Sequence, residues 1–212
     1  MTPDWYVNLR VQAAISAGGH GLAQTAGPGA LANSVMARLL NVVHAISAAN
    51  GFEFATAFPL ARFGEHPHPG NLLRIFMSTR EQTDSLLEAL EGHEFLMGYV
   101  HLDRPRKVPL SVDASVSYQL FRITSRKNRN AITRQRQLER GNSLPYVRMV
   151  SSNGEAFSLR FDIIKRDLVA DTDGKTNGYG LSARVTPFFL PDIPAEAAPW
   201  EAAARSAQTS LQ

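Results

Sequence analysis

The 212-residue sequence contains no cysteine, and this absence removes two classes of protein from consideration. Without thiols, the chain can form neither a disulfide framework nor a thiolate metal site. No apolar run approaches the ~20 residues that a membrane-spanning helix needs. Residues 1–10 also lack the basic start and apolar stretch of a secretory signal. We therefore expect a cytoplasmic protein with no membrane association.

Acidic residues are scarce in the middle of the chain. Between Arg104 and Arg148, eleven Lys and Arg residues stand against only Asp113 and Glu139. The rest of the chain holds eleven basic and seventeen acidic residues. A basic segment within an otherwise acidic protein is typical of a polyanion-binding protein. A solvated basic face without any partner would have the same composition, so charge alone leaves both alternatives open.

The common catalytic signatures are also missing. The sequence has no P-loop, nucleophile elbow, zinc signature or paired-carboxylate motif. His66-Pro67-His68 resembles a pair of metal ligands, but no third ligand follows at a convincing spacing. We expect neither a metal nor a cofactor.

The first hundred residues alternate between two periodicities. A period of two over Trp5–Val11 predicts a strand, and an amphipathic helix before Gly51 is predicted by the spacing of Leu31, Val35, Leu39, Val43 and Ile46. Further strands are expected at 52–58, 72–77 and 95–102, and a helix from Ser78 or Thr79 to Leu90. The resulting order, βαββαβ, is that of a ferredoxin-like domain.

The second half predicts a smaller unit. An extended segment at 116–124 precedes a helix at 128–140 that ends at Gly141, and strands at 146–150 and 157–163 flank the turn Ser152-Asn153-Gly154. The fold class is therefore α+β, with an N-terminal ferredoxin-like βαββαβ domain and a smaller C-terminal domain of a basic helix and antiparallel strands. The expected boundaries are 1–104 for the ferredoxin-like domain, 105–191 for an RNA-binding domain and 192–212 for a tail.

Arginine spacing suggests how the basic segment binds its partner. In a helical backbone one face would be shared by Arg122, Arg126, Arg129, Arg136 and Arg140, with Arg134 on a neighbouring face. Guanidinium groups suit phosphate because their planar fork binds two oxygens at once. A helix can reach the major groove of A-form RNA only near the open end of a stem, so an RNA hairpin is favoured over a long duplex.

Several motifs in order resemble one known family, the CRISPR repeat-processing endoribonucleases of type I-F systems, including forms associated with transposons. The matching features are His44 followed by Ala57-Phe58-Pro59, the segment Phe121-Arg122-Ile123-Thr124, Pro145-Tyr146-Val147 leading to Ser151, Gly154 and Phe157, and Tyr179-Gly180-Leu181-Ser182. The resemblance covers residues 4 to 190 approximately. It implies a ferredoxin-like first domain, an arginine-rich helix and a small sheet.

The resemblance also implies roles for the matched residues. His44 would be the general base, Ser151 would hold the ribose 2′-hydroxyl in line, and Tyr179 would position the imidazole or the RNA. Phe157 would stack on the terminal base pair of the hairpin. Contacts with phosphate or base edges are implied for Arg122, Thr124, Ser152 and the arginines at positions 126, 129, 134, 136 and 140.

The activity that this resemblance implies is metal-independent cleavage of pre-crRNA at the 3′ base of the repeat hairpin. The products would be a 2′,3′-cyclic phosphate and a 5′-hydroxyl, and the enzyme would keep its crRNA within a Cascade effector complex with other subunits. Two alternatives remain open. One is a non-cleaving crRNA hairpin-binding subunit, and the other is a ferredoxin-like protein unrelated to RNA, such as a small-molecule sensor.

Overall fold

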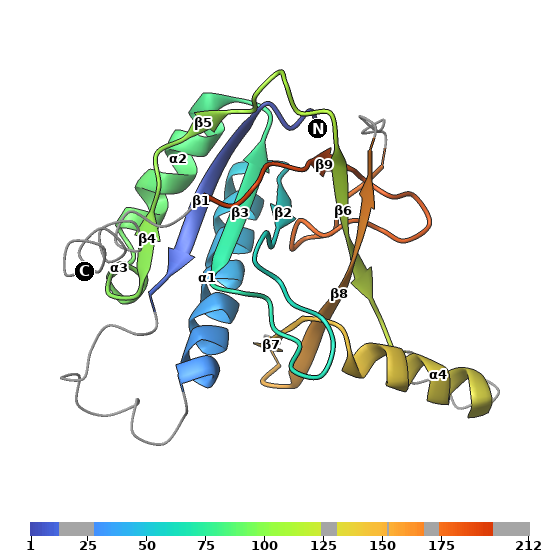
Figure 1. Cartoon of the computed structure of the whole chain (residues 1–212). Coiled ribbons are helices and arrows are strands. Elements are labelled where there is room, and N and C mark those ends of the chain that lie inside the picture. Colours follow the sequence, from blue (N-terminus) through green and yellow to red (C-terminus); the bar gives the residue numbers. More distant parts are fainter. Residues whose placement is uncertain (13–27, 124–130, 152, 168–173, 197–212) are drawn as a thin grey trace, which may run out of the picture.

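The computed structural model describes residues 1–12, 28–123, 131–151, 153–167 and 174–196, and it confirms the α+β class. Two antiparallel sheets lie side by side, and helices cover one face of the first (Figure 1). None of the helices in these ranges is long and apolar enough to cross a bilayer.

The first sheet contains the predicted ferredoxin-like arrangement. Its strands are β1 (Trp5–Val11), β2 (Ala55–Ala57), β3 (Leu72–Met77), β4 (Val100–Leu102) and β5 (Arg106–Lys107). The order is β2-β3-β1-β4, and β5 adds a short pairing with β1. β1 and β3 are the central strands, and apart from Trp5 at the start of β1 every residue in them is buried.

Two long helices pack on this sheet as the periodicity predicted. α1 (Pro28–Asn50) buries an apolar stripe that includes Val35, Leu39 and Val43, and Gly51 follows it with φ +66°. α2 (Arg80–Glu91) begins with a capping box. There Thr79 accepts from the backbone N–H of Gln82, whose side chain accepts from the Thr79 N–H.

Two strand predictions in this half were wrong in extent. The predicted strand 95–102 divides into the helical turn α3 (Glu94–Met97) and β4, because Leu96 turns inward and the Phe95 ring packs against Tyr99 at 5.1 Å. The strand predicted at 52–58 is only β2, since the N–H of Phe52 bonds to Ser47 at the end of α1 instead of joining the sheet.

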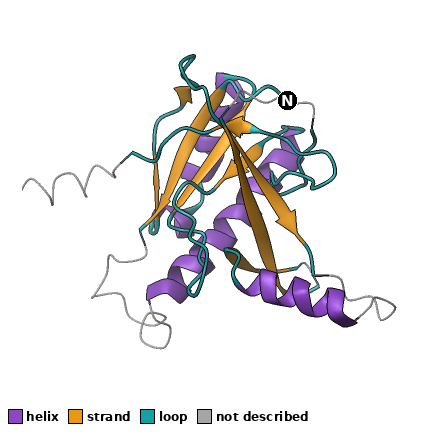
Figure 2. Cartoon of the chain, turned by 45° about the vertical axis from the view of Figure 1, so that its right-hand side comes forward, coloured by secondary structure: helices purple, strands orange, loops and turns teal. Residues whose placement is uncertain are grey.

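The second sheet has the order β7-β8-β6-β9. Its strands are β6 (Ser115–Phe121), β7 (Tyr146–Val150), β8 (Ala156–Arg166) and β9 (Leu190–Pro191). Between β6 and β7 lies α4 (Ala131–Asn142), which extends away from the body of the molecule in both views (Figures 1 and 2). Gly141 does not end this helix as predicted but lies within it, where a Cβ would come 2.9 Å from Ile123.

Three aromatic side chains join the two sheets. Phe58, just after β2, stacks on Phe161 of β8 with ring centroids 4.3 Å apart. Tyr118 of β6 packs against both rings, at 6.2 Å in each case. All three belong to one continuous hydrophobic core. The ferredoxin-like part and the second sheet are therefore held rigidly together, which fixes the position of any site between them.

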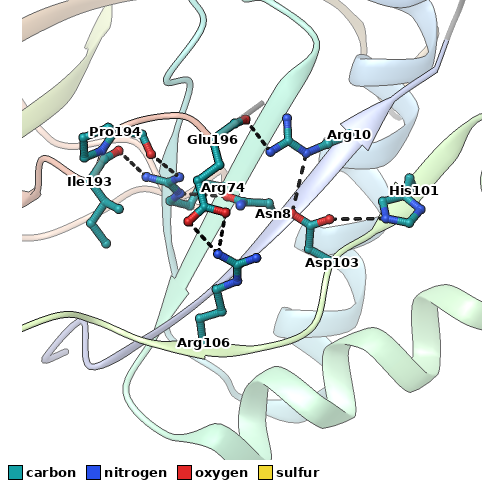
Figure 3. Close-up of polar contacts among 9 residues, drawn as sticks. All are labelled: Asn8, Arg10, Arg74, His101, Asp103, Arg106, Ile193, Pro194 and Glu196. Atoms are coloured by element: carbon teal, nitrogen blue, oxygen red, sulfur yellow. Dashed lines mark hydrogen bonds and ion pairs between the residues drawn. The ribbon is translucent and has the colours of Figure 1, made fainter. Parts of the chain in front are cut away.

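The chain after β9 crosses the face of the first sheet opposite α1 (Figures 1 and 3). Arg74, only 2% exposed, donates to the Asn8 side chain at 2.8 Å and to the carbonyls of Ile193 and Pro194 at 2.5 and 3.2 Å. Arg106 binds the Glu196 carboxylate at 2.6 Å. Residues 193–196, which the sequence places in a tail, thus pack against β1, β3 and β5. The domain boundaries themselves stay a prediction.

Candidate active site and nucleic-acid interface

His44 lies in the last third of α1, half-buried, on the side of the helix that faces the second sheet's loops. Its imidazole packs against Tyr179, with ring centroids 5.3 Å apart and planes tilted by 42°. The predicted base and the predicted tyrosine are therefore in contact, although 135 residues separate them in the chain.

The loop that carries Tyr179 is bonded to both sheets. On one side, Thr56 of β2 donates its N–H to the Gly180 carbonyl at 2.9 Å and its hydroxyl to the Tyr179 carbonyl at 2.8 Å. On the other side, Ser182 exchanges two backbone hydrogen bonds with β6, at 2.8 and 3.0 Å. Within the loop, the Asn177 side-chain oxygen accepts from two backbone N–H groups, at 2.9 and 3.0 Å. These bonds fix where the tyrosine ring is placed.

Two glycines allow this loop to approach α1 and β2 closely. Gly180 has φ +72°, and a Cβ there would lie 2.4 Å from the Thr56 hydroxyl oxygen. At Gly178 a Cβ would lie 2.8 Å from Cε1 of His44. Because Gly178 has no side chain, the His44 imidazole can occupy the space beside it.

A cavity of about 590 Å³ brings together three of the predicted site residues. Arg122 at the end of β6, Phe157 near the start of β8 and Tyr179 all line it. The Arg122 side chain is exposed, and Phe157 is 36% exposed despite its size. A cationic group and an accessible aromatic face in one hollow suit an RNA strand, because stacking and phosphate pairing act together there.

A second cavity of about 570 Å³ lies on the other side of the His44–Tyr179 pair. His44 lines it, and Asn177 lines both cavities. Its remaining wall comes from the end of α1, from residues 52–54 and from the segment 174–178, with Phe188 behind. No motif in the sequence indicated this cavity.

Ser151 lies at the turn between β7 and β8, half-buried. Its hydroxyl accepts a hydrogen bond from the Glu155 N–H at 3.1 Å, and its backbone N–H donates to the Glu155 carbonyl at 2.9 Å. Met149, two residues earlier, pairs with Phe157, which lines the first cavity. Among the described residues, however, Ser151 itself lines neither cavity. Its predicted role in holding the 2′-hydroxyl stays a prediction.

The predicted arginine face is only partly on a helix. Arg134 and Arg136 lie exposed on α4, and Arg140 pairs with Asp162 of β8. Arg122 does not lie on this helix: it follows the end of β6 and lines the first cavity. Four predicted contacts lie outside the described residues, namely Thr124, Arg126, Arg129 and Ser152.

Sequence reasoning missed two residues of the first cavity. Arg160 lines it while donating to the Gly141 carbonyl at 2.5 Å, and its guanidinium lies over the Tyr146 ring at 4.9 Å. Asn177 lines it too. The Asn-Gly dipeptide at 177–178 was a visible turn signal, but nothing in the local sequence places that turn beside His44.

The His66-Pro67-His68 segment has a structural role. The backbone of His68 pairs with Arg62 at 2.9 and 3.1 Å, and its Nδ1 accepts from the Gly70 N–H at 3.0 Å. Partial burial, together with the nearby Arg62 charge, lowers the pKa of His68. In the part of the chain that the structure describes, no three His, Asp or Glu side chains are grouped to hold a metal ion.

Comparison with known families gives one match. The model of a family described as CRISPR-associated protein (Cas_Csy4) matches residues 24–189, more than three quarters of the chain. The matched range begins before α1 and ends just before β9, so it includes His44, α4, the first cavity and all of the second cavity's lining residues except Met1. A search of curated proteins found no match.

Proposed function

The chain belongs to the Cas_Csy4 family of CRISPR-associated proteins, which process CRISPR RNA, and from this premise we propose that it is a metal-independent endoribonuclease. Its substrate is the repeat hairpin of pre-crRNA from a type I-F or related array, and it cuts at the 3′ base of the stem. One observation supports this most directly. The His44 imidazole packs against Tyr179, and Tyr179 lines the cavity that also holds Arg122 and Phe157.

The first cavity binds the base of the hairpin stem, and α4 binds its groove. Phe157 stacks on the last base pair of the stem, because its face is open in the cavity. Arg122 and Arg160 contact the strand beside it. Arg134 and Arg136 project from α4 toward the groove of the stem, where their guanidinium groups bind phosphates or guanine edges. With the hairpin bound in this way, we expect the 3′ base of the stem to lie next to His44.

The reaction needs only the substrate's own nucleophile. His44 takes the proton from the 2′-hydroxyl upstream of the cut, the 2′-oxygen bonds to phosphorus, and the bond from phosphorus to the 5′-oxygen breaks. The departing 5′-oxygen takes up a proton from solvent water, which leaves a 2′,3′-cyclic phosphate and a 5′-hydroxyl. Ser151 orients the 2′-hydroxyl, since a hydroxyl that accepts one hydrogen bond can still donate another. Tyr179 keeps the imidazole in position.

The protein then keeps its product and carries it into a Cascade effector complex. The stem contacts do not change when the strand is cut, so the crRNA hairpin stays bound after cleavage. Most of that affinity comes from arginine–phosphate contacts, and it should therefore fall steeply with added salt.

The decisive experiment uses the purified protein and a labelled repeat hairpin from the same locus in excess EDTA. We expect one cut at the 3′ base of the stem, with ends that carry a cyclic phosphate and a 5′-hydroxyl. His44→Ala should slow cleavage by about 10²–10⁴-fold, the usual worth of a general base, while hairpin binding persists. His66→Ala, in an exposed loop, serves as the matched histidine control and should cut normally.

Two other results would change the conclusion. Tight binding without any cut by the unaltered protein would favour the non-cleaving hairpin-binding subunit. Cleavage that EDTA abolishes would contradict the metal-independent mechanism.

A further inference from the structure

We propose that the cavity lined by His44 and Lys175 is a subsite for the nucleotide immediately downstream of the cut, whose base it holds. This inference rests on the proposed function, because it takes His44 as the place where the scissile phosphate lies. It assigns a role to the second cavity, which takes no part in the proposed contacts with the hairpin stem.

The position of the cavity points to this occupant. Tyr179 lines the cavity assigned to the stem, His44 lines the neighbouring one, and Asn177 lines both. A strand that leaves the stem and passes its phosphate by the imidazole therefore continues into the second hollow. The nucleotide that enters is the one that carries the 5′-oxygen leaving group.

The walls of the cavity suit a nucleobase. Phe52, Phe54 and Phe188 supply apolar surface that matches the faces of a flat ring. The hydroxyl of Ser47 is buried there and has no hydrogen-bond partner in the described part of the protein. An unpaired buried hydroxyl is costly, so a polar base edge that reached it would be favoured. The volume of about 570 Å³ falls within the range of small-ligand sites.

The charges at the cavity also favour RNA. Lys175 lines it and is exposed, so its ammonium group can donate to acceptor atoms on the base edge. Glu53 is the one carboxylate among the described lining residues, and it lies 3.4 Å from the amino group of Met1. The cavity therefore presents the Lys175 ammonium group to an incoming strand, while the Glu53 carboxylate is paired with the Met1 amino group.

Holding the downstream base aligns the leaving oxygen with the attacking 2′-oxygen. In-line displacement is sensitive to that alignment, so occupancy of the subsite should raise the rate of cleavage. It should not affect retention of the processed hairpin, because that product ends before the subsite.

A kinetic comparison tests the subsite. Single-turnover cleavage is measured for an intact repeat RNA and for one that is abasic at the first downstream position. We expect the abasic RNA to be cut about tenfold more slowly, as for the loss of hydrogen bonds to a charged group. Lys175→Gln should slow the intact RNA by a similar factor but slow the abasic RNA little further. Lys165→Gln, at the far end of β8, is the matched control and should leave both rates unchanged.

Binding of the product hairpin, which ends at the cut, should be equal for Lys175→Gln and the unaltered protein. Equal cleavage of intact and abasic RNA would overturn the subsite. The subsite would also be overturned if Lys175→Gln slowed the abasic RNA by as large a factor as the intact RNA. It would likewise be overturned if Lys175→Gln weakened product binding by as large a factor as it slowed cleavage.

A spectroscopic measurement separates this inference from the proposed function. The RNA carries 2-aminopurine at the first downstream position and a 2′-deoxyribose before it, so that it cannot be cut. We expect the probe's fluorescence to change when the RNA binds, and Phe52→Leu to reduce that change. An unaltered signal in a bound complex would overturn the subsite. Absence of cleavage of ribose-containing RNA would overturn the ribonuclease proposal alone.

Discussion

His44 and Gly178 come from distant parts of the chain, and the space between them is smaller than one methyl group needs. A Cβ at Gly178 would lie 2.8 Å from Cε1 and 3.2 Å from Nδ1 of the imidazole. The ring is the free end of a side chain, so it can move aside at little cost in folding. Catalysis is more sensitive than folding to the position of the imidazole, because displacement of a reacting group by about 1 Å can lower the rate by about 10²-fold.

Gly178→Ala should therefore separate stability from activity. We expect single-turnover cleavage to fall by about 10- to 100-fold, with hairpin affinity and the free energy of unfolding almost unchanged. Cleavage assays, RNA titration and chemical denaturation measure the three quantities. Gly92→Ala at the end of α2 is the control, since its nearest neighbour would be at an ordinary 3.6 Å. Undiminished cleavage by Gly178→Ala would argue against His44 as the base.

At the scale of elements, α4 differs from the other helices. α1 and α2 bury apolar stripes against the first sheet, whereas most side chains of α4 are exposed. Its C-terminal end is fixed by the Arg140–Asp162 pair and by Arg160 on the Gly141 carbonyl. A helix with so little buried surface contributes little to folding, and its exposed Arg134 and Arg136 can contact a polyanion.

Replacing Arg134 and Arg136 together by Gln should weaken hairpin binding and flatten its salt dependence. Each lost phosphate contact lowers the slope of log affinity against log salt by about 0.7–0.9, so we expect a reduction of about 1.5 for the double variant. Cleavage of RNA that is already bound should be unchanged. Arg80→Gln on α2, whose side chain pairs with Asp84, controls for net charge. An unchanged slope would exclude α4 from the RNA interface.

At the scale of the whole molecule, residues 193–196 connect the end of the second sheet to the centre of the first. Arg74 makes this connection from β3, with three acceptors on β1 and on the returning chain (Figure 3). Burial lowers the pKa of Arg74, and electrostatic interactions with Tyr6, Tyr118 and Glu196 offset part of that shift. With the Phe58–Phe161 stack, this network fixes one sheet against the other and so fixes the site between them.

Arg74→Met should destabilise the protein because it leaves three acceptors, two of them buried, without their donor. We expect a loss of about 3 kcal/mol in the free energy of unfolding, measured by chemical denaturation. Arg106→Gln removes the exposed pair with Glu196 and should cost less than about 1 kcal/mol. Equal effects of the two variants would show that the buried network does not stabilise the fold.

The sequence by itself determined the elements whose physical signal is local. The stripe of α1, the strand β1 and the start of α2, predicted at Ser78 or Thr79, each arise from neighbours along the chain, and all three elements were predicted correctly. The extents of β2 and α3 were not, because hydrogen bonds to Ser47 and the packing of Leu96 and Phe95 override the local pattern.

The candidate site was predictable only in part. His44, Arg122, Phe157 and Tyr179 were named from ordered motifs, but their proximity depends on loop-to-strand hydrogen bonds that no local pattern encodes. The second cavity, with Ser47 and Lys175, exists only where the end of α1 meets the segment 174–178. Composition and periodicity thus predicted the fold class, and composition indicated a polyanion partner without excluding a solvated basic face. Long-range packing alone decided which side chains meet, because contacts between residues far apart in the chain leave no periodic trace in it.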